Sequence, residues 1–231
     1  MSKYNKPLFD AVTIYWHYET KQIQIDNSAL NTAKLFFDNY CLTNQDSLLI
    51  CEIGSQIYRT YECPQTLRDV APKNSTYVGL DFCEGEGVDV VLNDHYKYPF
   101  DDNTFDCVVT SSWFEHSEMF WISFLEAIRI LKPSGVMYCN APASNMPYHT
   151  FPVDCWRFFP DAGKALEKWG RYNDLSVKLL ETYIVKPNYQ KQDDHIADFV
   201  SIFIKDETYE DLYPNRIKEL DNYDDQFKFI N

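Results

Sequence analysis

One short segment of the chain gathers four side chains that could do chemistry. In "YHTFPVDCWRFFP", residues 148–160, His149 and Asp154 are followed by Trp156 and Arg157. Histidine is the natural general base near neutral pH, so His149 is the favoured candidate for that role. Asp154 would orient His149 or bind a hydroxyl group of the substrate. Both are therefore candidate catalytic residues.

Trp156 and Arg157 each have a second interpretation. Trp156 would stack on the apolar face of a sugar, or it belongs to the core. Arg157 would hold an anionic group or the loop itself, or it forms a structural ion pair with Asp154. The sequence favours the structural interpretations, and both residues remain candidates for substrate binding, together with Trp113.

His116, in the sequence "WFEH", is a competing candidate for the base. It lies where a predicted strand gives way to a predicted helix. At that position it would also be able to cap the helix or to face a bound cofactor. It is kept as a third candidate catalytic residue.

The elements that must position these residues follow from hydrophobic periodicity. Helical spacing predicts helices over 27–41, 66–70, 117–131 and 161–170. Apolar runs predict strands over 47–53, 76–81, 88–94, 105–113, 136–142, 176–185 and 198–205. The segment "KPSG", residues 132–135, is expected to end the third helix. Such alternation predicts a parallel sheet flanked by helices, with ligands at the carboxyl ends of the strands.

The loop after the first strand, in "SLLICEIGSQIYRT", contains one glycine, Gly54, and Gln56 stands where a second would be expected. A dinucleotide fingerprint and a phosphate-binding P-loop are both absent. The pair Gly85 and Gly87 follows the second strand and leads into another strand, so it is interpreted as a turn. The loop therefore favours a ligand without a pyrophosphate.

Charge and composition narrow the function further. The chain of 231 residues has a net charge of −14 and no basic stripe, which disfavours nucleic acid and favours a small neutral or cationic ligand. No apolar run reaches the length of a membrane span, and the polar start is not a signal peptide. The seven scattered cysteines predict reduced thiols in a cytoplasmic protein, and nothing in the sequence requires a metal.

Five motifs, taken in order, resemble those of class I S-adenosylmethionine-dependent methyltransferases over about residues 47–206. They are "CEIGS", "YVGLDF", "GVDVVLND", "YPFDDNTFDCVVTSSWFEH" and "LKPSGVMYCNAP". The resemblance implies an α/β fold, a Rossmann-like three-layer αβα sandwich. Its seven-stranded sheet would be mostly parallel, with the last strand antiparallel. It also implies S-adenosyl-L-methionine as the cofactor.

The resemblance assigns cofactor-binding roles to seven residues: Glu52, Gly54, Ser55, Asp81, Phe82, Asp94 and Ser111. Glu52 and Gly54 would flank the methionine part of the cofactor. Asp81 would accept hydrogen bonds from the ribose hydroxyls, and Asp94 would lie near the adenine amine. Ser111 would lie where the methionine end meets the substrate. Alternatively, Glu52 forms a salt bridge at the strand end, and the two aspartates are turn residues.

The first loop departs from the family pattern. Besides Gln56, it carries an insert over 56–65 that separates Glu52 from Asp81 by more than the usual spacing. The insert would cover the carboxylate of the cofactor, with Arg59 or Arg68 as its ion partner, or it is a solvated loop.

The expected organisation has three parts. Residues 1–46 form an N-terminal cap or lid, in which the aromatic segment 15–18 would fold over the site or pack on the core. Residues 47–206 form the methyltransferase core, and residues 207–231 an acidic, aromatic tail. The oligomeric state is left open, with a homodimer as one option.

The acceptor is predicted from two observations. The motif associated with methylation of amines on nucleic-acid bases, Asn/Asp-Pro-Pro-Tyr/Phe, does not follow the fourth strand. The segment from His149 to Phe158 resembles the "H-x-x-P-x-D-x-W-R-F" loop of a subgroup associated with surface-polysaccharide synthesis. We therefore expect methyl transfer to a hydroxyl of a sugar, nucleotide-sugar or related metabolite. The alternatives are a catalytically silent, cofactor-binding partner in a biosynthetic complex and a protein methyltransferase.

Overall fold

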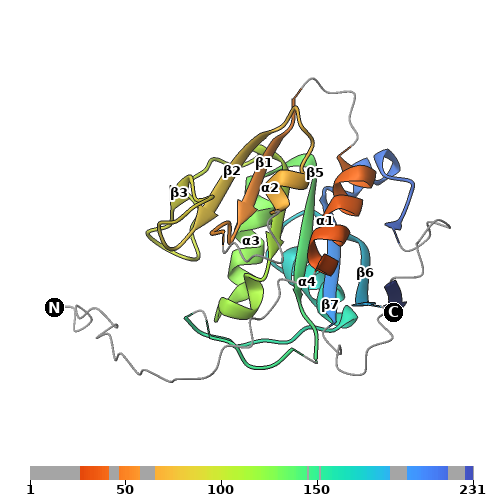
Figure 1. The fold of residues 1–231 in the computed structure, drawn as a ribbon. Coiled ribbons are helices and arrows are strands. Elements are labelled where there is room, and N and C mark those ends of the chain that lie inside the picture. The colour runs from red at the N-terminus through yellow and green to blue at the C-terminus, as the bar shows by residue number, and fades with distance from the viewer. Residues whose placement is uncertain are drawn as a thin grey trace, which may run out of the picture.

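The computed structural model describes residues 27–41, 47–57, 66–144, 146–150, 152–187, 197–217 and 227–230. Over these residues the chain forms one mixed sheet with the strand order β3-β2-β1-β4-β5-β7-β6-β8. The strands are β1 (Leu49–Ile53), β2 (Thr76–Asp81), β3 (Val90–Val91), β4 (Phe105–Ser111), β5 (Leu131–Pro142), β6 (Val177–Pro187), β7 (Asp198–Lys205) and β8 (Phe227–Ile230). Figure 1 shows the sheet running through the middle of the molecule.

The first five strands pair in parallel, and β7 is inserted antiparallel between β5 and β6. This confirms the expected seven-stranded arrangement with its last strand antiparallel. In the described part of the chain, the short strand β8 adds an eighth member, antiparallel to β6. Because the parallel strands share one direction, the carboxyl ends of β1, β2, β4 and β5 meet at one edge of the sheet.

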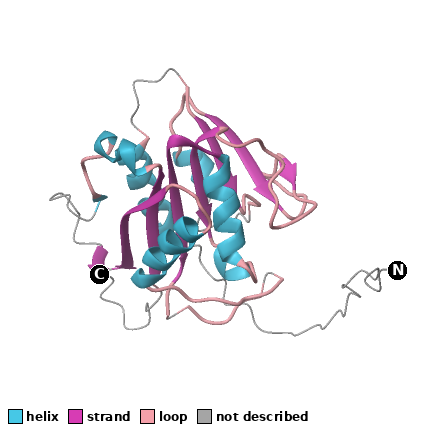
Figure 2. Cartoon of the chain, turned by 180° about the vertical axis from the view of Figure 1, so that it is seen from behind, coloured by secondary structure: helices cyan, strands magenta, loops and turns pink. Residues whose placement is uncertain are grey.

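Helices cover both faces of the sheet, as the views from opposite sides show (Figures 1 and 2). The described helices are α1 (Asn27–Tyr40), α2 (Leu67–Val70), α3 (Phe120–Ile130) and α4 (Pro160–Tyr172), with 3-10 turns η1 (Phe114–His116) and η2 (Glu207–Leu212). Helices α3 and α4 pack on one face, and α1 and α2 on the other. The fold is therefore the expected three-layer αβα sandwich.

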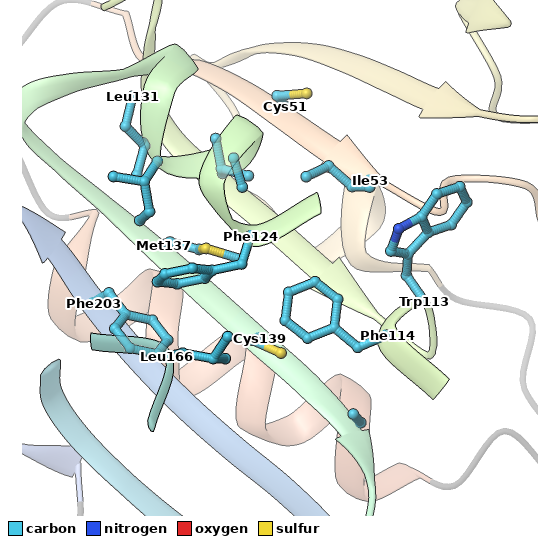
Figure 3. Close-up of a cluster of buried hydrophobic side chains, with 14 of the residues drawn as sticks. Cys51, Ile53, Trp113, Phe114, Phe124, Leu131, Met137, Cys139, Leu166 and Phe203 are labelled. Atoms are coloured by element: carbon cyan, nitrogen blue, oxygen red, sulfur yellow. The ribbon is translucent and has the colours of Figure 1, made fainter. Parts of the chain in front are cut away.

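The larger core lies between the sheet and helices α3 and α4. Figure 3 shows Phe124 of α3 and Leu166 of α4 pointing toward Met137 and Phe203 of the sheet. The periodic apolar residues of α3 face this core, which confirms the helix predicted there. The helix ends at Ile130, and the predicted terminator "KPSG" is the irregular start of β5, opposite a shift of register between Phe105 and Cys107 of β4.

The opposite core contains α1. Ala33, Phe36 and Phe37 are buried against strands β5 and β6, so this helix belongs to a layer of the sandwich although it lies within the expected N-terminal cap 1–46. The aromatic segment 15–18 lies outside the described residues. In the expected tail 207–231, Ile217 is buried in the same core. Among the described residues, no helix has the length and hydropathy needed to cross a membrane.

Candidate active site

Gly54 turns the chain sharply at the end of β1. It has a φ of +81°, a conformation that side-chain-bearing residues rarely adopt, and a Cβ atom there would lie 2.9 Å from the ring of Trp113. The amides of Gly54 and Ser55 both donate to the Leu80 carbonyl, at 2.9 and 3.2 Å. The single glycine of the loop is therefore required by its backbone conformation and by the indole packed against it.

The carboxylate of Asp81, at the end of β2, is held by three backbone amides. Its Oδ2 accepts from Gln56 N at 3.0 Å, and its Oδ1 from Phe82 N and Cys83 N at 2.7 and 3.3 Å. Asp81 is 3% exposed, and burial raises the pKa of this carboxyl, although the three amides and the nearby His95 partly offset the rise. Asp81 therefore holds the turn after β2, as the turn interpretation predicts, and its role toward a ribose stays a prediction.

Gln56 joins the loop after β1 to the loop after β2. Besides the contact with Asp81, its side-chain amide donates to the Glu84 carbonyl at 3.3 Å. Glycines at 85 and 87 permit this close approach, since a Cβ at Gly85 would meet the Gln56 side chain at 2.5 Å and one at Gly87 the Ser55 carbonyl at 2.6 Å. The pair is a turn, as expected, and its function is to let the two loops lie against each other.

Glu52 lies on the α1 face of the sheet and is 8% exposed. It accepts a hydrogen bond from the Tyr77 hydroxyl at 2.9 Å. The Arg68 guanidinium lies 5.0 Å from the centre of the Tyr77 ring and bonds to Asp89 at 2.5 Å. Burial raises the pKa of Glu52 to about 7, opposed by Tyr77 and by the charge of Arg68. Arg68 therefore has protein partners, whereas Arg59, the other predicted ion partner, lies outside the described residues.

The raised pKa of Glu52 predicts a pH dependence of stability. The folded protein holds a proton on this carboxyl up to about pH 7, whereas the unfolded chain releases it near 4.5, so stability falls as the pH rises between these values. Glu52→Gln retains an acceptor for Tyr77 but cannot ionise. The wild type should therefore lose stability relative to Glu52→Gln as the pH rises. Urea titrations should show that the unfolding free energy of the variant minus that of the wild type is larger at pH 8 than at pH 4.5, by roughly 3 kcal/mol. The matched variant Glu84→Gln, at an exposed position, should show a constant difference, and a constant difference for Glu52→Gln would contradict the prediction.

Aromatic rings connect the ends of β2, β3 and β4. Phe82 contacts the rings of Trp113 and His95, with centroids 5.6 and 5.2 Å apart. Asp94, next to His95, is exposed, and its carboxylate accepts from Tyr96 N at 2.9 Å in a turn. The structure thus brings Phe82 and the turn of Asp94 together. It places Trp113, a predicted substrate-binding residue, among the predicted cofactor residues, with only 4% of its surface exposed.

Four buried polar atoms near this edge have no hydrogen-bond partner within the described residues: Ser55 Oγ, Thr110 Oγ1, Trp113 Nε1 and Asn140 Nδ2. Ser111, the predicted residue of β4, donates from Oγ to Asn140 Oδ1 at 3.4 Å. Unsatisfied buried donors are costly and are typical of sites that bind a polar ligand. Together with Gly54 and Asp81, they fit a cofactor that carries hydroxyl, amine and carboxylate groups.

Arg157 ties the loop after β5 into one unit. Its guanidinium contacts both oxygens of Asp154, at 2.5 and 2.7 Å, and also donates to the carbonyls of Met146, Pro147 and Trp156. All five of its N–H donors are used, which leaves none for a substrate anion. Burial alone would raise the pKa of Asp154, but Arg157 and the His149 amide outweigh it and lower that pKa. The contacts support the ion-pair and loop-anchoring interpretations of Arg157.

Both candidate bases meet at the end of β4. The rings of His116 and His149 lie edge to face with centroids 5.0 Å apart. His116 Nδ1 is 2.5 Å from the Val153 carbonyl, and His149 Nδ1 is 3.0 Å from the Pro147 carbonyl. Burial lowers the pKa of His116. In both rings the second nitrogen, Nε2, remains for a substrate or another ligand.

Glu115 is the third member of this cluster, and the sequence did not indicate it. It is fully buried, and Oε1 is 3.6 Å from His116 Nε2. Among the described residues, neither carboxylate oxygen has a hydrogen-bond partner within 3.5 Å. Burial raises the pKa of Glu115 to about 8, and the nearby charge of Asp154 adds to this rise. The available signal was an acidic residue beside a histidine in the aromatic sequence "WFEH".

Trp156 lies to one side of the cluster. Its indole nitrogen donates to the Ser117 carbonyl at 3.1 Å, and its ring contacts Phe120 and Trp121 of α3. It remains 36% exposed, so it belongs to the rim of the loop and not to the core. Its predicted role in stacking on a sugar stays a prediction.

Residues 41–139 match the family model described as a methyltransferase domain. Over these residues the chain is similar to methyltransferase domains. The matched residues include β1, β2 and β4, with Gly54, Asp81 and the Glu115–His116 pair. The chain is accordingly an enzyme of methyl transfer, and its cofactor is S-adenosylmethionine. A search of curated proteins found no match by sequence.

Solved structures share the fold of this chain. The 1,6-didemethyltoxoflavin-N1-methyltransferase of Burkholderia thailandensis, solved with S-adenosylhomocysteine, has a TM-score of 0.54 at 12% identity, covering 78% of this chain and 80% of that one. YcgJ of Bacillus subtilis has a TM-score of 0.52 at 10% identity, covering 79% and 100%. The [4+2]-cyclase SpnF has a TM-score of 0.53 at 12% identity, covering 83% and 86%. Proteins of this fold include a methyltransferase and a cyclase, so the fold does not identify the methyl acceptor. The acceptor has to be inferred from the residues of the site.

Proposed function

We propose that this methyltransferase transfers the methyl group of S-adenosylmethionine to a hydroxyl group of a small molecule, a sugar, nucleotide-sugar or related metabolite. The observation that carries the proposal is the meeting of Glu115, His116 and His149 at the carboxyl ends of β4 and β5, on the same edge of the sheet as Gly54 and Asp81. The net charge of −14 favours such an acceptor over a polyanion.

The cofactor supplies an electrophilic methyl group on a sulfonium. The protein must place the acceptor oxygen in line with the breaking sulfur–carbon bond and remove its proton. The oxygen–carbon bond forms as the sulfur–carbon bond breaks, and sulfur retains the electron pair. His149 Nε2 is the atom proposed to take the proton, because Nδ1 faces the Pro147 carbonyl and carries a hydrogen there.

The positions of the predicted cofactor residues support a common binding site. Gly54 brings backbone amides to the edge of the sheet, and Asp81 ends the neighbouring strand β2 with its carboxylate. A carboxylate at this position is suited to accept hydrogen bonds from two neighbouring ribose hydroxyls. We propose that the orphan donors Ser55 Oγ and Asn140 Nδ2 bind the amino-acid end of the cofactor.

The proposal is tested in two stages. Calorimetry with S-adenosylhomocysteine should show binding, and no binding at millimolar concentration would contradict it. Methyl-labelled cofactor is then supplied with sugars, nucleotide-sugars, small amines and basic peptides, and we expect label on a sugar oxygen. Label on a peptide would favour protein methylation, and binding without transfer to any acceptor would favour a silent partner. With the true acceptor, His149→Ala should lower kcat at least about 100-fold, with affinity for S-adenosylhomocysteine retained.

A further inference from the structure

The carboxylate of Glu115 lies in η1, shortly after β4, and has no exposed surface. Among the described residues, neither of its oxygens has a hydrogen-bond partner within 3.5 Å. A buried carboxylate without partners is strongly destabilising, because it loses its hydration and gains nothing in return. Such a group is accommodated in its protonated form or by a ligand that carries compensating charge.

A ring nitrogen of His116 and one of His149 lie within 4.8 Å of a Glu115 oxygen. His116 Nδ1 and His149 Nδ1 each point at a backbone carbonyl, of Val153 and Pro147, and a carbonyl can only accept a hydrogen bond. Each Nδ1 therefore carries the proton, and each Nε2 presents a lone pair. Histidine ligands of metal ions have this arrangement, in which a second group fixes the tautomer. In His149 the Asp154 carboxylate lies 3.4 Å from Nδ1 and further favours a proton on that nitrogen.

One ligand atom from each of Glu115, His116 and His149 lies within 4.8 Å of the others, and Glu115 Oε1 to His116 Nε2 is 3.6 Å. Two nitrogens and one carboxylate oxygen around an ion at about 2.0–2.2 Å are a ligand set typical of zinc and related divalent cations. We infer that Glu115, His116 and His149 bind one divalent transition-metal cation of the Zn²⁺ type.

Three protein ligands leave a coordination position open, as in catalytic zinc sites. The two histidine side chains are 10% and 19% exposed, so the open side of the cluster is accessible from solvent. There the cation would bind the acceptor hydroxyl and promote loss of its proton to water. This role rests on the proposed function, whereas metal binding itself does not. With the cation bound, His149 Nε2 is a ligand, and coordination replaces proton uptake by that atom.

The test uses untagged full-length protein, stripped with EDTA and titrated with Co²⁺. We expect one equivalent to bind, with visible absorption of a four- or five-coordinate ion, and Zn²⁺ to displace it. His116→Ala, His149→Ala and Glu115→Gln should each weaken binding by more than about 100-fold, and Asp154→Asn by about 10–100-fold. His95→Ala, which removes a histidine outside the cluster, should bind as the wild type does. Circular dichroism and cooperative urea unfolding show that each variant is folded.

Absence of stoichiometric binding in the folded wild type would overturn the inference, as would binding that survives both histidine substitutions. The catalytic role is examined separately. If the metal binds and EDTA abolishes methyl transfer, with recovery on adding Zn²⁺ or Co²⁺, the cation acts on the acceptor. If the metal binds and transfer is unchanged in EDTA, the site stands and its role in the reaction is refuted. Failure to bind S-adenosylhomocysteine would contradict the proposed function and leave the metal titration unaffected.

Discussion

Asp81→Ala is expected to reduce the affinity for S-adenosylhomocysteine by at least about 100-fold. The proposed role of Asp81 is to accept hydrogen bonds from both ribose hydroxyls, and bonds to a charged acceptor contribute about 1.5–3 kcal/mol each. The substitution also leaves the amides of Gln56, Phe82 and Cys83 without their acceptor, so we expect a loss of stability of about 3 kcal/mol.

Calorimetry and urea unfolding measure the two effects of Asp81→Ala separately. Asp101→Ala provides the control, because Asp101 is an exposed aspartate in the loop before β4, at the opposite end of the strands. It should change neither quantity. An Asp81→Ala protein that is destabilised but binds the ligand as the wild type does would show that Asp81 only holds the turn.

Arg157→Ala is expected to destabilise the protein by about 3–5 kcal/mol. Asp154 has no exposed side-chain surface, and Arg157 satisfies both of its oxygens. Removal of one member of a buried ion pair leaves the other charge buried and uncompensated. Arg171→Ala removes an exposed arginine of α4 that also contacts carboxylates, and it should cost at most about 1 kcal/mol in the same denaturant titration.

The double variant Arg157→Ala/Asp154→Ala distinguishes the buried charge from general loss of packing. It should regain most of the stability lost in Arg157→Ala, because no unpaired charge remains. Methyl transfer should stay low in both, since the Asp154 carboxylate accepts from the His149 amide at 2.7 Å and fixes that part of the loop. If the double variant is less stable than Arg157→Ala, the ion pair is not the source of the loss.

The fold was predictable because it depends on patterns that are local in sequence. The apolar spacing of Phe124 and Ile128 defines α3, and the order of the strand motifs defines the parallel part of the sheet. Elements held by tertiary contacts were less predictable. Strand β3 is only two residues long, because its pairing with β2 ends at Asp81 and Val91. The core position of α1 depends on residues of β5 and β6, which are distant in sequence.

The candidate site was predictable to a smaller extent. His116 and His149 were recognised from their residue type, but their contact depends on how the loop after β5 folds back onto η1, where Cys155 N donates to the Glu115 carbonyl at 2.7 Å. Glu115 was missed because its complete burial arises from packing around the end of β4. The hydrogen bonds of Arg157 were likewise not predictable from sequence. Two of them reach the carbonyls of Met146 and Pro147, 11 and 10 residues earlier in the chain, and depend on how the loop folds.

The contact between Gln56 and Asp81 makes the orientation of the proposed ribose acceptor depend on the loop after β1. A carboxylate oxygen accepts more than one hydrogen bond, so a ribose hydroxyl can share Oδ2 with the Gln56 backbone amide, which holds that oxygen in place before the cofactor arrives. The close packing of the Gln56 side chain against Gly85 fixes the position of this amide in turn. Residues that never touch the cofactor, including Gly85 and Gly87, would thereby determine how well its acceptor is oriented in advance.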